Sequence, residues 1–387
     1  MDKSIKNIKK QSIDYIKKTY YDNGSLKEEI SIYNNKNNGL YKLYYLTGEL
    51  WKKINYIDDR INGLFESYHK NGNIAVCVNY NNNFMNGICK KYWSNGELES
   101  EINYTNGQKN GIYNSYHNIG KLYETCNYNN GKINGIFKSY HEDGYLWSEV
   151  NYIDNKKEGY EKTYYNNGNI SSIVCYVNNL KEGIYKSYYT NKNICNEINY
   201  INNNINGLYK SYWENGRLLY IVNYINNLKN GIYKSYYYNG QLCQTINYTD
   251  DIMNGTRLVY HYINEFDNSE LDNKLDNTKN NQINNAIDLF FDVPHILNEF
   301  SIKKKEMYIN NFRQGLSLTY WENGNIYEEI NYIDDKKNGL YLKYYENGDL
   351  WEEIEYIDDK KNGYYKKYID NKIYEEIIYI NDRIKNN

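Results

Sequence analysis

Glycine recurs along this chain of 387 residues at two fixed positions of a 24-residue unit. The first series, the lead glycines, comprises Gly39, Gly63, Gly87, Gly111, Gly135, Gly159, Gly183, Gly207, Gly231, Gly255, Gly315, Gly339 and Gly363. The second series, the tip glycines, comprises Gly24, Gly48, Gly72, Gly96, Gly120, Gly144, Gly168, Gly216, Gly240, Gly324 and Gly348. A period this strict indicates a repeat architecture, in which each unit contacts its neighbours and the array grows by adding units.

Each unit predicts a β-hairpin. The segment 207–224 reads GLYKSYWENGRLLYIVNY, two runs rich in Tyr, Ile and Val separated by Asn-Gly. Asn-Gly between two such runs is the strongest short-range hairpin signal and favours a type I′ turn, whose two central residues need positive φ. We therefore expect an all-β fold, an elongated antiparallel β-meander solenoid of about thirteen hairpin repeats, with the glycines there for backbone geometry.

A two-residue turn also predicts the strand register. The residue three after the lead glycine would lie opposite the residue fourteen after it, and opposite charges in such a pair support a sheet face. The resulting pairs, three of opposite and one of like charge, are Lys90–Glu101, Lys138–Glu149, Lys186–Glu197 and Lys42–Lys53.

The same register divides each unit into two faces, because successive side chains of a strand alternate. The face expected to be the main buried one carries Tyr209, Trp213, Leu218, Val222 and Tyr224. The opposite face carries Leu208, Lys210, Tyr212 and Asn223, and it keeps a row of tyrosines that makes it the better candidate for contacting a partner. The candidate partner-binding residues of that row are Tyr140, Tyr164, Tyr188, Tyr212 and Tyr236.

Composition excludes several classes of function. The net charge is -3 with both signs interspersed, so no basic field indicates a nucleic-acid partner. The six cysteines occupy five different positions of the unit and are interpreted as reduced structural thiols. No secretory signal and no run near the roughly 18 apolar residues of a membrane span is present, which predicts an intracellular, cytoplasmic protein.

No pattern of catalytic, metal-binding or cofactor-binding residues emerges. Four of the five histidines, His69, His117, His141 and His261, share one repeat position where other units have Tyr or Trp, so they are interpreted as members of an aromatic ladder. Asp-Asp pairs in the longer connections lack the distant glutamate of a calcium loop and are interpreted as solvated. We expect no enzyme, no metal and no cofactor.

The repeat is interrupted once, between Gly255 and Gly315, by an insertion at residues 265–301 that replaces a hairpin tip. Its second half, 286–300, reads AIDLFFDVPHILNEF. This half is either a short helix or extended segment over the sheet, a partner-docking element, or a neutral product of a repetitive gene. Its candidate binding residues are Leu289, Phe290, Phe291, Ile296, Leu297 and Phe300.

The unit has the form NGxYxxYxxNGxLxxxxxY from Tyr20 to Tyr379 and resembles the MORN repeat, in the variant form of the YwqK-type antitoxin family. The Asn, Ile, Lys and Tyr-rich composition is also similar to MORN proteins of giant DNA viruses of amoebae. The resemblance divides the chain into a basic N-terminal cap (1–13), a MORN-like array (14–264), the insertion (265–301), and a second array with a C-terminal cap (302–387).

The resemblance implies an extended, twisted antiparallel sheet without catalytic residues of its own. Members of the family act in protein association, in phosphoinositide or membrane contact, or in neutralising bacterial toxins. The leading hypothesis is a non-enzymatic scaffold that binds a protein through the tyrosine face or the insertion. The alternatives are peripheral membrane binding, suggested by the row Lys138, Lys162, Lys186, Lys210 and Lys234, and an antitoxin-like role.

Overall fold

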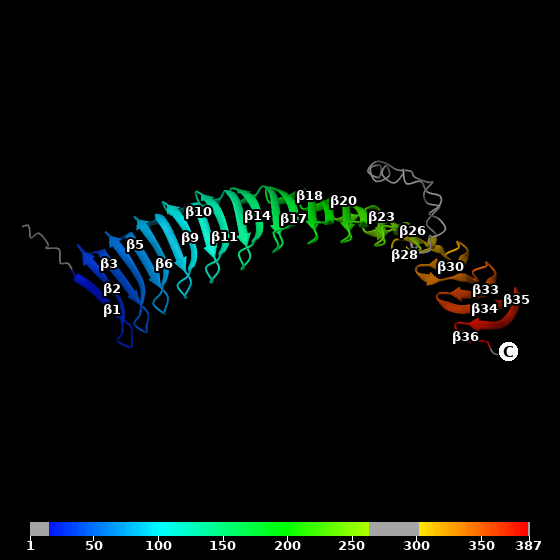
Figure 1. The fold of residues 1–387 in the computed structure, drawn as a ribbon. Coiled ribbons are helices and arrows are strands. Elements are labelled where there is room, and N and C mark those ends of the chain that lie inside the picture. The colour runs from blue at the N-terminus through cyan, green and yellow to red at the C-terminus, as the bar shows by residue number, and fades with distance from the viewer. Residues whose placement is uncertain (1–14, 263–301, 386–387) are drawn as a thin grey trace, which may run out of the picture. The chain divides into compact units, whose positions relative to one another are not determined.

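The computed structural model describes residues 15–262 and 302–385, and throughout these ranges the chain is all-β without a helix. The chain divides into two compact units, Met1–Gly183 and Ile184–Asn387, with the boundary inside strand β18. Within each unit the strands pair antiparallel with their neighbours in chain order (Figure 1). The predicted antiparallel meander is confirmed.

The strands of the first unit are β1 (Tyr15–Tyr20), β2 (Leu26–Tyr33), β3 (Lys36–Tyr44), β4 (Leu50–Ile57), β5 (Arg60–Tyr68), β6 (Ile74–Asn81), β7 (Phe84–Met85), β8 (Gly87–Tyr92), β9 (Leu98–Thr105), β10 (Gln108–Tyr116), β11 (Leu122–Asn129), β12 (Lys132–Ile133), β13 (Gly135–Tyr140), β14 (Leu146–Ile153), β15 (Lys156–Lys157), β16 (Gly159–Tyr164), β17 (Ile170–Val177) and the start of β18 (Leu180–Tyr188).

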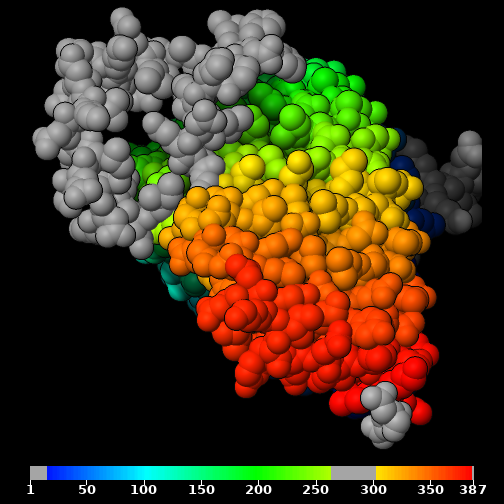
Figure 2. Space-filling view, turned by 90° about the vertical axis from the view of Figure 1, so that its right-hand side faces the viewer, coloured from blue at the N-terminus to red at the C-terminus, as the bar shows by residue number. Residues whose placement is uncertain are grey.

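The strands of the second unit are β19 (Ile194–Ile201), β20 (Asn204–Tyr212), β21 (Leu218–Ile225), β22 (Leu228–Lys229), β23 (Gly231–Tyr236), β24 (Leu242–Thr249), β25 (Ile252–Met253), β26 (Gly255–Tyr260), β27 (Ile302–Ile309), β28 (Phe312–Arg313), β29 (Gly315–Tyr320), β30 (Ile326–Ile333), β31 (Lys336–Lys337), β32 (Gly339–Tyr344), β33 (Leu350–Ile357), β34 (Lys360–Ile369), β35 (Lys372–Ile380) and β36 (Arg383–Ile384). In the space-filling view of Figure 2 the colour of this unit grades from green to red along the chain.

The turn at the hairpin tip differs from the predicted type I′ turn. In the tip between β20 and β21, the amide of Gly216 donates to the carbonyl of Trp213 at 2.9 Å, and the amide of Trp213 donates to the carbonyl of Arg217 at 2.7 Å. Gly216 has a φ of 86°, whereas Asn215 is not among the residues of positive φ. These contacts define a three-residue loop, a type I turn followed by glycine in the left-handed conformation.

The asparagine of the tip has a hydrogen-bonding role in place of the predicted left-handed conformation. The Asn215 Oδ1 accepts from the amide of Arg217 at 2.9 Å, and its Nδ2 donates to the carbonyl of Tyr238 in the next repeat at 3.0 Å. A short amide side chain that bonds the backbone two residues on is a common turn device. The residue therefore stabilises its own loop and connects it to the following one.

The predicted register is nevertheless correct beyond the tip, since Lys90 pairs with Glu101 and Lys138 with Glu149. The loop contains one residue more than predicted, so the first pair is displaced and Tyr212 lies opposite Leu218. A β-bulge then adds one residue to the second strand and restores the displaced register.

Two sheet faces follow from this pairing. The core face contains Val222, which is 1 % exposed, opposite Tyr209. The ring centroid of Tyr209 lies 5.9 Å from that of Tyr224, so tyrosine rings flank a line of buried aliphatic side chains. The prediction that Leu218 belongs to this face is wrong, because Leu218 pairs with Tyr212 and shares the opposite, outer face.

Type I′ geometry occurs instead in the longer connection, where Asp58 and Asp59 have φ values of 49° and 66°. The amide of Asp59 donates to the carbonyl of Asn37 at 2.9 Å, and the amide of Asn37 donates to the Asp59 Oδ1 at 2.7 Å. The same pair of hydrogen bonds joins Ile205 to Asn227 at 2.9 and 2.7 Å. These acidic and amide pairs, interpreted from sequence as solvated, connect their turns to the strand that follows the preceding turn.

Two glycines outside both series, Gly107 and Gly131, occupy the second position of such turns with φ of 81°. The amide of Gly131 still donates to the carbonyl of Lys109 at 2.8 Å. A glycine has no side-chain oxygen, so it cannot accept the second hydrogen bond. The position tolerates glycine because positive φ is free of strain there.

Replacing Gly131 by asparagine is therefore expected to stabilise this turn by about 0.5–1 kcal/mol, through a new bond from the Lys109 amide. A Cβ at this position meets no atom within 4 Å. Slower hydrogen exchange of the Lys109 amide would report the gain. The matched Gly107→Asn variant should gain less stability, since its Cβ would lie 3.2 Å from Phe84 Cδ1. Equal or reversed effects would contradict the role assigned to the side-chain hydrogen bond.

The interrupted repeat has a charged core. β26 pairs with β27 across the insertion, with Gly255 opposite Tyr308, so the two strands form one split hairpin. Arg257 and Glu306 occupy the places held elsewhere by Tyr209 and Val222, and Glu306 is 2 % exposed. The insertion 265–301, with Leu289, Phe290, Phe291, Ile296, Leu297 and Phe300, lies outside the described residues.

Candidate interaction surface

His69 and His261 belong to a ladder of aromatic hydrogen-bond donors beside the tips. The His69 Nε2 lies 2.8 Å from the carbonyl oxygen of Tyr92 in the next repeat, and the Tyr189 hydroxyl donates to the carbonyl of Tyr212 at 2.7 Å. Trp93 makes the equivalent bond through Nε1 at 3.3 Å. This bond needs a ring with a donor at its far edge, which Tyr, Trp and His share and Phe lacks.

Substitution by phenylalanine tests this ladder. His69→Phe is expected to destabilise its repeat by about 1 kcal/mol, because the Tyr92 carbonyl loses its donor. His117→Phe is the matched control, since the His117 Nε2 is buried with no hydrogen-bond partner within the described residues. Thermal melting of the two variants should differ accordingly; an equal loss would show that ring packing, and not the donor, decides the residue type.

The predicted tyrosine row lies on the outer face, and its members are half-buried. The Tyr164 hydroxyl donates to Glu149 at 2.7 Å, and the Tyr212 hydroxyl donates to Glu197 at 2.8 Å. Burial, with the bond to Glu149 second, raises the pKa of Tyr164 to about 12. Tyr140, Tyr188 and Tyr236 occupy the equivalent positions of their own repeats. The hydroxyls of Tyr164 and Tyr212 are therefore already engaged in hydrogen bonds within the sheet.

Lysines of the outer face pair with glutamates on adjacent strands. In the first unit Lys42 lies 2.8 Å from Glu29, while in the second Lys186 lies 2.9 Å from Glu197. Burial opposes ionisation of Glu197, but hydrogen bonds from Lys186 and Tyr212 outweigh it and hold its pKa below the ordinary value. Such partly exposed pairs contribute little to stability.

The apolar residues that directly follow the lead glycines are exposed on the outer face. They are here called the aliphatic row. Sequence reasoning did not single it out, although an aliphatic or tyrosine side chain follows most lead glycines. The members in the first unit that are 40–65 % exposed are Leu64, Ile88, Ile112, Ile136 and Tyr160. Those in the second unit, 50–58 % exposed, are Ile184, Leu208, Ile232, Leu316, Leu340 and Tyr364.

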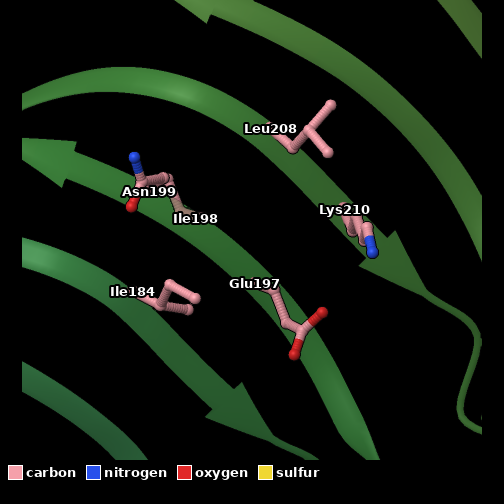
Figure 3. Close-up of a pocket in the computed structure, with 6 residues that line it drawn as sticks. All are labelled: Ile184, Glu197, Ile198, Asn199, Leu208 and Lys210. Atoms are coloured by element: carbon pink, nitrogen blue, oxygen red, sulfur yellow. The ribbon is translucent and has the colours of Figure 1, made fainter. Parts of the chain in front are cut away.

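A shallow pocket of about 250 Å³ lies on this row in the second unit. Ile184 of β18 and Leu208 of β20 flank β19, and Figure 3 shows their side chains on either side of Asn199. Glu197 and Lys210 line its other side. An apolar side chain between Ile184 and Leu208 would thus meet aliphatic walls with charged groups beside them.

A family model for the variant MORN repeat matches residues 16–35, 37–58, 61–82, 85–106, 133–154, 157–178, 181–202, 205–226, 229–250, 313–334 and 337–358, together more than half of the chain. The chain belongs to the MORN repeat variant family. Each of these segments contains the tip loop and the second strand of a hairpin. The MORN hairpin β10–β11 has the same pairing although no matched segment contains it.

Comparison of the MORN array with solved structures finds weak likenesses. The crystal structure of TcdB2-TccC3-TEV is 12% identical over 95% of this chain and 22% of that chain, with a TM-score of 0.15. The Photorhabdus luminescens Tc holotoxin pore is 10% identical over 91% of this chain and 19% of that one, TM-score 0.12. A porin-like protein from Bacteroides uniformis is 11% identical over 64% and 90%, TM-score 0.15. A comparison with curated proteins finds no match.

These TM-scores support no inference about the function of the MORN array, and the chain spans about a fifth of the length of the first of these structures, 22%. Within 15–262 and 302–385, no group of three or more His, Cys, Asp or Glu side chains is placed to hold a metal ion. The same residues contain no helix long and apolar enough to cross a bilayer. The six cysteines are free.

Proposed function

We propose that this MORN array is a non-enzymatic scaffold, without a cofactor, that binds a protein partner through the outer face. The observation that carries the proposal is the aliphatic row, whose side chains in the second unit are 50–58 % exposed. Exposed apolar side chains that recur along one face and are bordered by polar groups are a candidate protein-binding surface. Since hydroxyls of the tyrosine row such as those of Tyr164 and Tyr212 bond glutamates of the sheet, the aliphatic row supplies the binding contacts.

Affinity capture from the cell that naturally makes the chain tests this proposal. We expect Ile136→Ser to weaken capture of the bound protein about tenfold, because Ile136 is 57 % exposed in the row and loses its apolar contact. Ile119→Ser is the matched control, as Ile119 is 55 % exposed but lies in a tip loop. Capture that is equal for wild type and Ile136→Ser, and for the combined Ile112→Ser, Leu208→Ser and Ile232→Ser variant, would refute the outer face. Deletion of residues 265–301 tests whether the partner binds through the insertion instead.

Membrane or phosphoinositide contact is the second candidate, favoured by Lys210 and Lys234, whose cross-strand neighbours in their own hairpins are Ile221 and Thr245. It is opposed by the net charge of -3 and by the acidic partners of other outer-face lysines, such as Glu29 beside Lys42. Polybasic membrane segments usually gather four to eight basic residues. Failure to co-sediment with anionic vesicles at low salt would eliminate this candidate.

A third candidate rests on the sequence resemblance alone: neutralisation of a protein toxin, as in YwqK-type antitoxins. An intracellular location and an origin in a giant virus of amoebae are also proposed from the sequence. Co-expression with a candidate toxin would test the first, and detection of the chain in fractionated infected cells would test the others; unrelieved toxicity or absence from the cytoplasm would count against them.

A further inference from the structure

The outer face of the second unit has a local excess of positive charge in the three repeats that begin at Gly183, Gly207 and Gly231. Glu197 lies opposite both Lys186, which forms an ion pair with it, and Lys210, whereas the cross-strand neighbours of Lys234 are Ile221 and Thr245. Within the part of the chain that the structure describes, no carboxylate oxygen lies within 4.0 Å of the ammonium nitrogen of Lys210 or Lys234. Three lysines with one carboxylate between them favour an acidic ligand.

The apolar surface coincides with this charge. Ile184, Leu208 and Ile232 are 55, 50 and 58 % exposed, and each precedes one of the three lysines by two residues on the same strand face. The pocket of about 250 Å³ between Ile184 and Leu208 has Lys210 on its rim. A ligand for this surface thus combines aliphatic groups with carboxylates at a short distance from them.

The spacing of the repeats restricts the shape of that ligand. Equivalent residues recur every two strands, about 10 Å apart. Residues seven apart on an α-helix rise by about 10.5 Å, whereas residues on one face of an extended strand recur every ~6.7 Å. The seven-residue spacing of a helix laid across the strands therefore matches the spacing of Ile184, Leu208 and Ile232, whereas the spacing of an extended peptide does not.

We infer that this surface binds an acidic amphipathic helix of a protein partner. Aliphatic residues seven apart along the helix enter the spaces along Ile184, Leu208 and Ile232, and its glutamates or aspartates face Lys186, Lys210 and Lys234. The inference rests on the proposed scaffold function and names the chemistry of the partner. An anionic membrane offers the same charge but no seven-residue spacing, and three lysines accompanied by Glu197 fall short of a polybasic patch.

Binding of synthetic helical peptides to the full chain tests the inference. The probe has leucine at every seventh position with glutamates on the same side; the second peptide has lysine in place of glutamate, and the third has the leucines moved off that spacing. We expect measurable binding of the first peptide by fluorescence anisotropy, and at least about tenfold weaker binding of the other two. Binding of the first should weaken with salt, because partly exposed charges are screened.

Matched variants of the chain localise the peptide. Ile184→Ser and Lys210→Glu are each expected to weaken binding about tenfold, whereas Ile119→Ser, which alters a tip residue of the same exposure as Ile184, should leave it within twofold. Equal binding of the basic peptide, equal loss in all three variants, or binding to phosphatidylglycerol vesicles in place of the peptide would overturn the inference. If the peptide fails while partner capture still depends on the aliphatic row, the scaffold proposal stands without it; if neither depends on the row, both fall.

Discussion

Replacing Arg257 by tyrosine is expected to destabilise the split repeat by about 2–3 kcal/mol, because a buried carboxylate loses one of its two cationic partners. Glu306 is 2 % exposed, and Arg257 Nη1 lies 3.2 Å from its Oε2. Lys304 Nζ, at 2.8 Å from Oε1, would remain as its one ion-pair partner within the described residues. One cation on one edge of the carboxylate does not replace the lost arginine.

The reciprocal change should be milder. Glu306→Val removes the buried charge itself and leaves Arg257, whose side chain is 33% exposed, able to reach water and the Gln244 Oε1 at 3.0 Å. We expect a loss of about 1 kcal/mol. The double variant restores the tyrosine and aliphatic pair seen at Tyr209 and Val222, and should be as stable as the wild type or more so.

Hydrogen exchange of the amides in β26 and β27 is the suitable measurement, since a repeat array unfolds locally and a single global transition is not assured. The expected order of protection is double variant and wild type, then Glu306→Val, then Arg257→Tyr. Additive losses in the double variant would show that the two side chains act independently, and would contradict the buried pair.

Raising the pH above 10 is expected to destabilise the whole array. Burial, followed by the nearby Glu149, raises the pKa of Tyr164 to about 12, and burial with the nearby Glu329 does the same for Tyr344. An unfolded tyrosine ionises near 10, so between pH 10 and 12 the unfolded chain loses protons that the folded chain retains. Stability is therefore complete below pH 10 and is lost as the pH rises through 12.

The effect is cumulative because burial raises the pKa of tyrosines in most repeats, among them Tyr56, Tyr128, Tyr224 and Tyr356. These phenols are partly exposed, so each contributes well under the full value of the shift, and we expect a total on the order of a few kcal/mol. Circular dichroism melting at pH 9 and pH 11, with phenolate absorbance at 295 nm, would measure it. A melting temperature independent of pH in this range would contradict the burial of the phenols.

The strict period of the glycines was enough to predict the hairpin array, because each unit repeats the same strand and turn chemistry. The turn type was harder to predict from Asn-Gly, since glycine suits both the second residue of a type I′ turn and the third residue of a loop in which a type I turn ends in a bulge. The difference lies in the backbone of Asn215, which the hydrogen bonds to Arg217 and Tyr238 decide. The second of these partners belongs to the next repeat and is not visible in a local motif.

The candidate surface was only half predictable. Alternation placed Leu208, Lys210 and Tyr212 on one face, and their placement together is correct. Which of them remain available to a partner depends on contacts between strands: Tyr212 bonds Glu197, whereas Leu208 is 50 % exposed. Likewise the Arg257 and Glu306 pair is separated by the insertion, so no short-range pattern could connect the two residues.

Site-specific photo-crosslinking tests the central claim most directly. A photoreactive residue placed at Leu208, on the outer face, and one placed at Asn215, in the exposed tip of the same hairpin, report on two surfaces of one repeat. The scaffold account predicts that the protein captured from the native cell crosslinks through position 208 and not through position 215. Crosslinking through 215 alone, or through neither position while the partner remains bound, would contradict it.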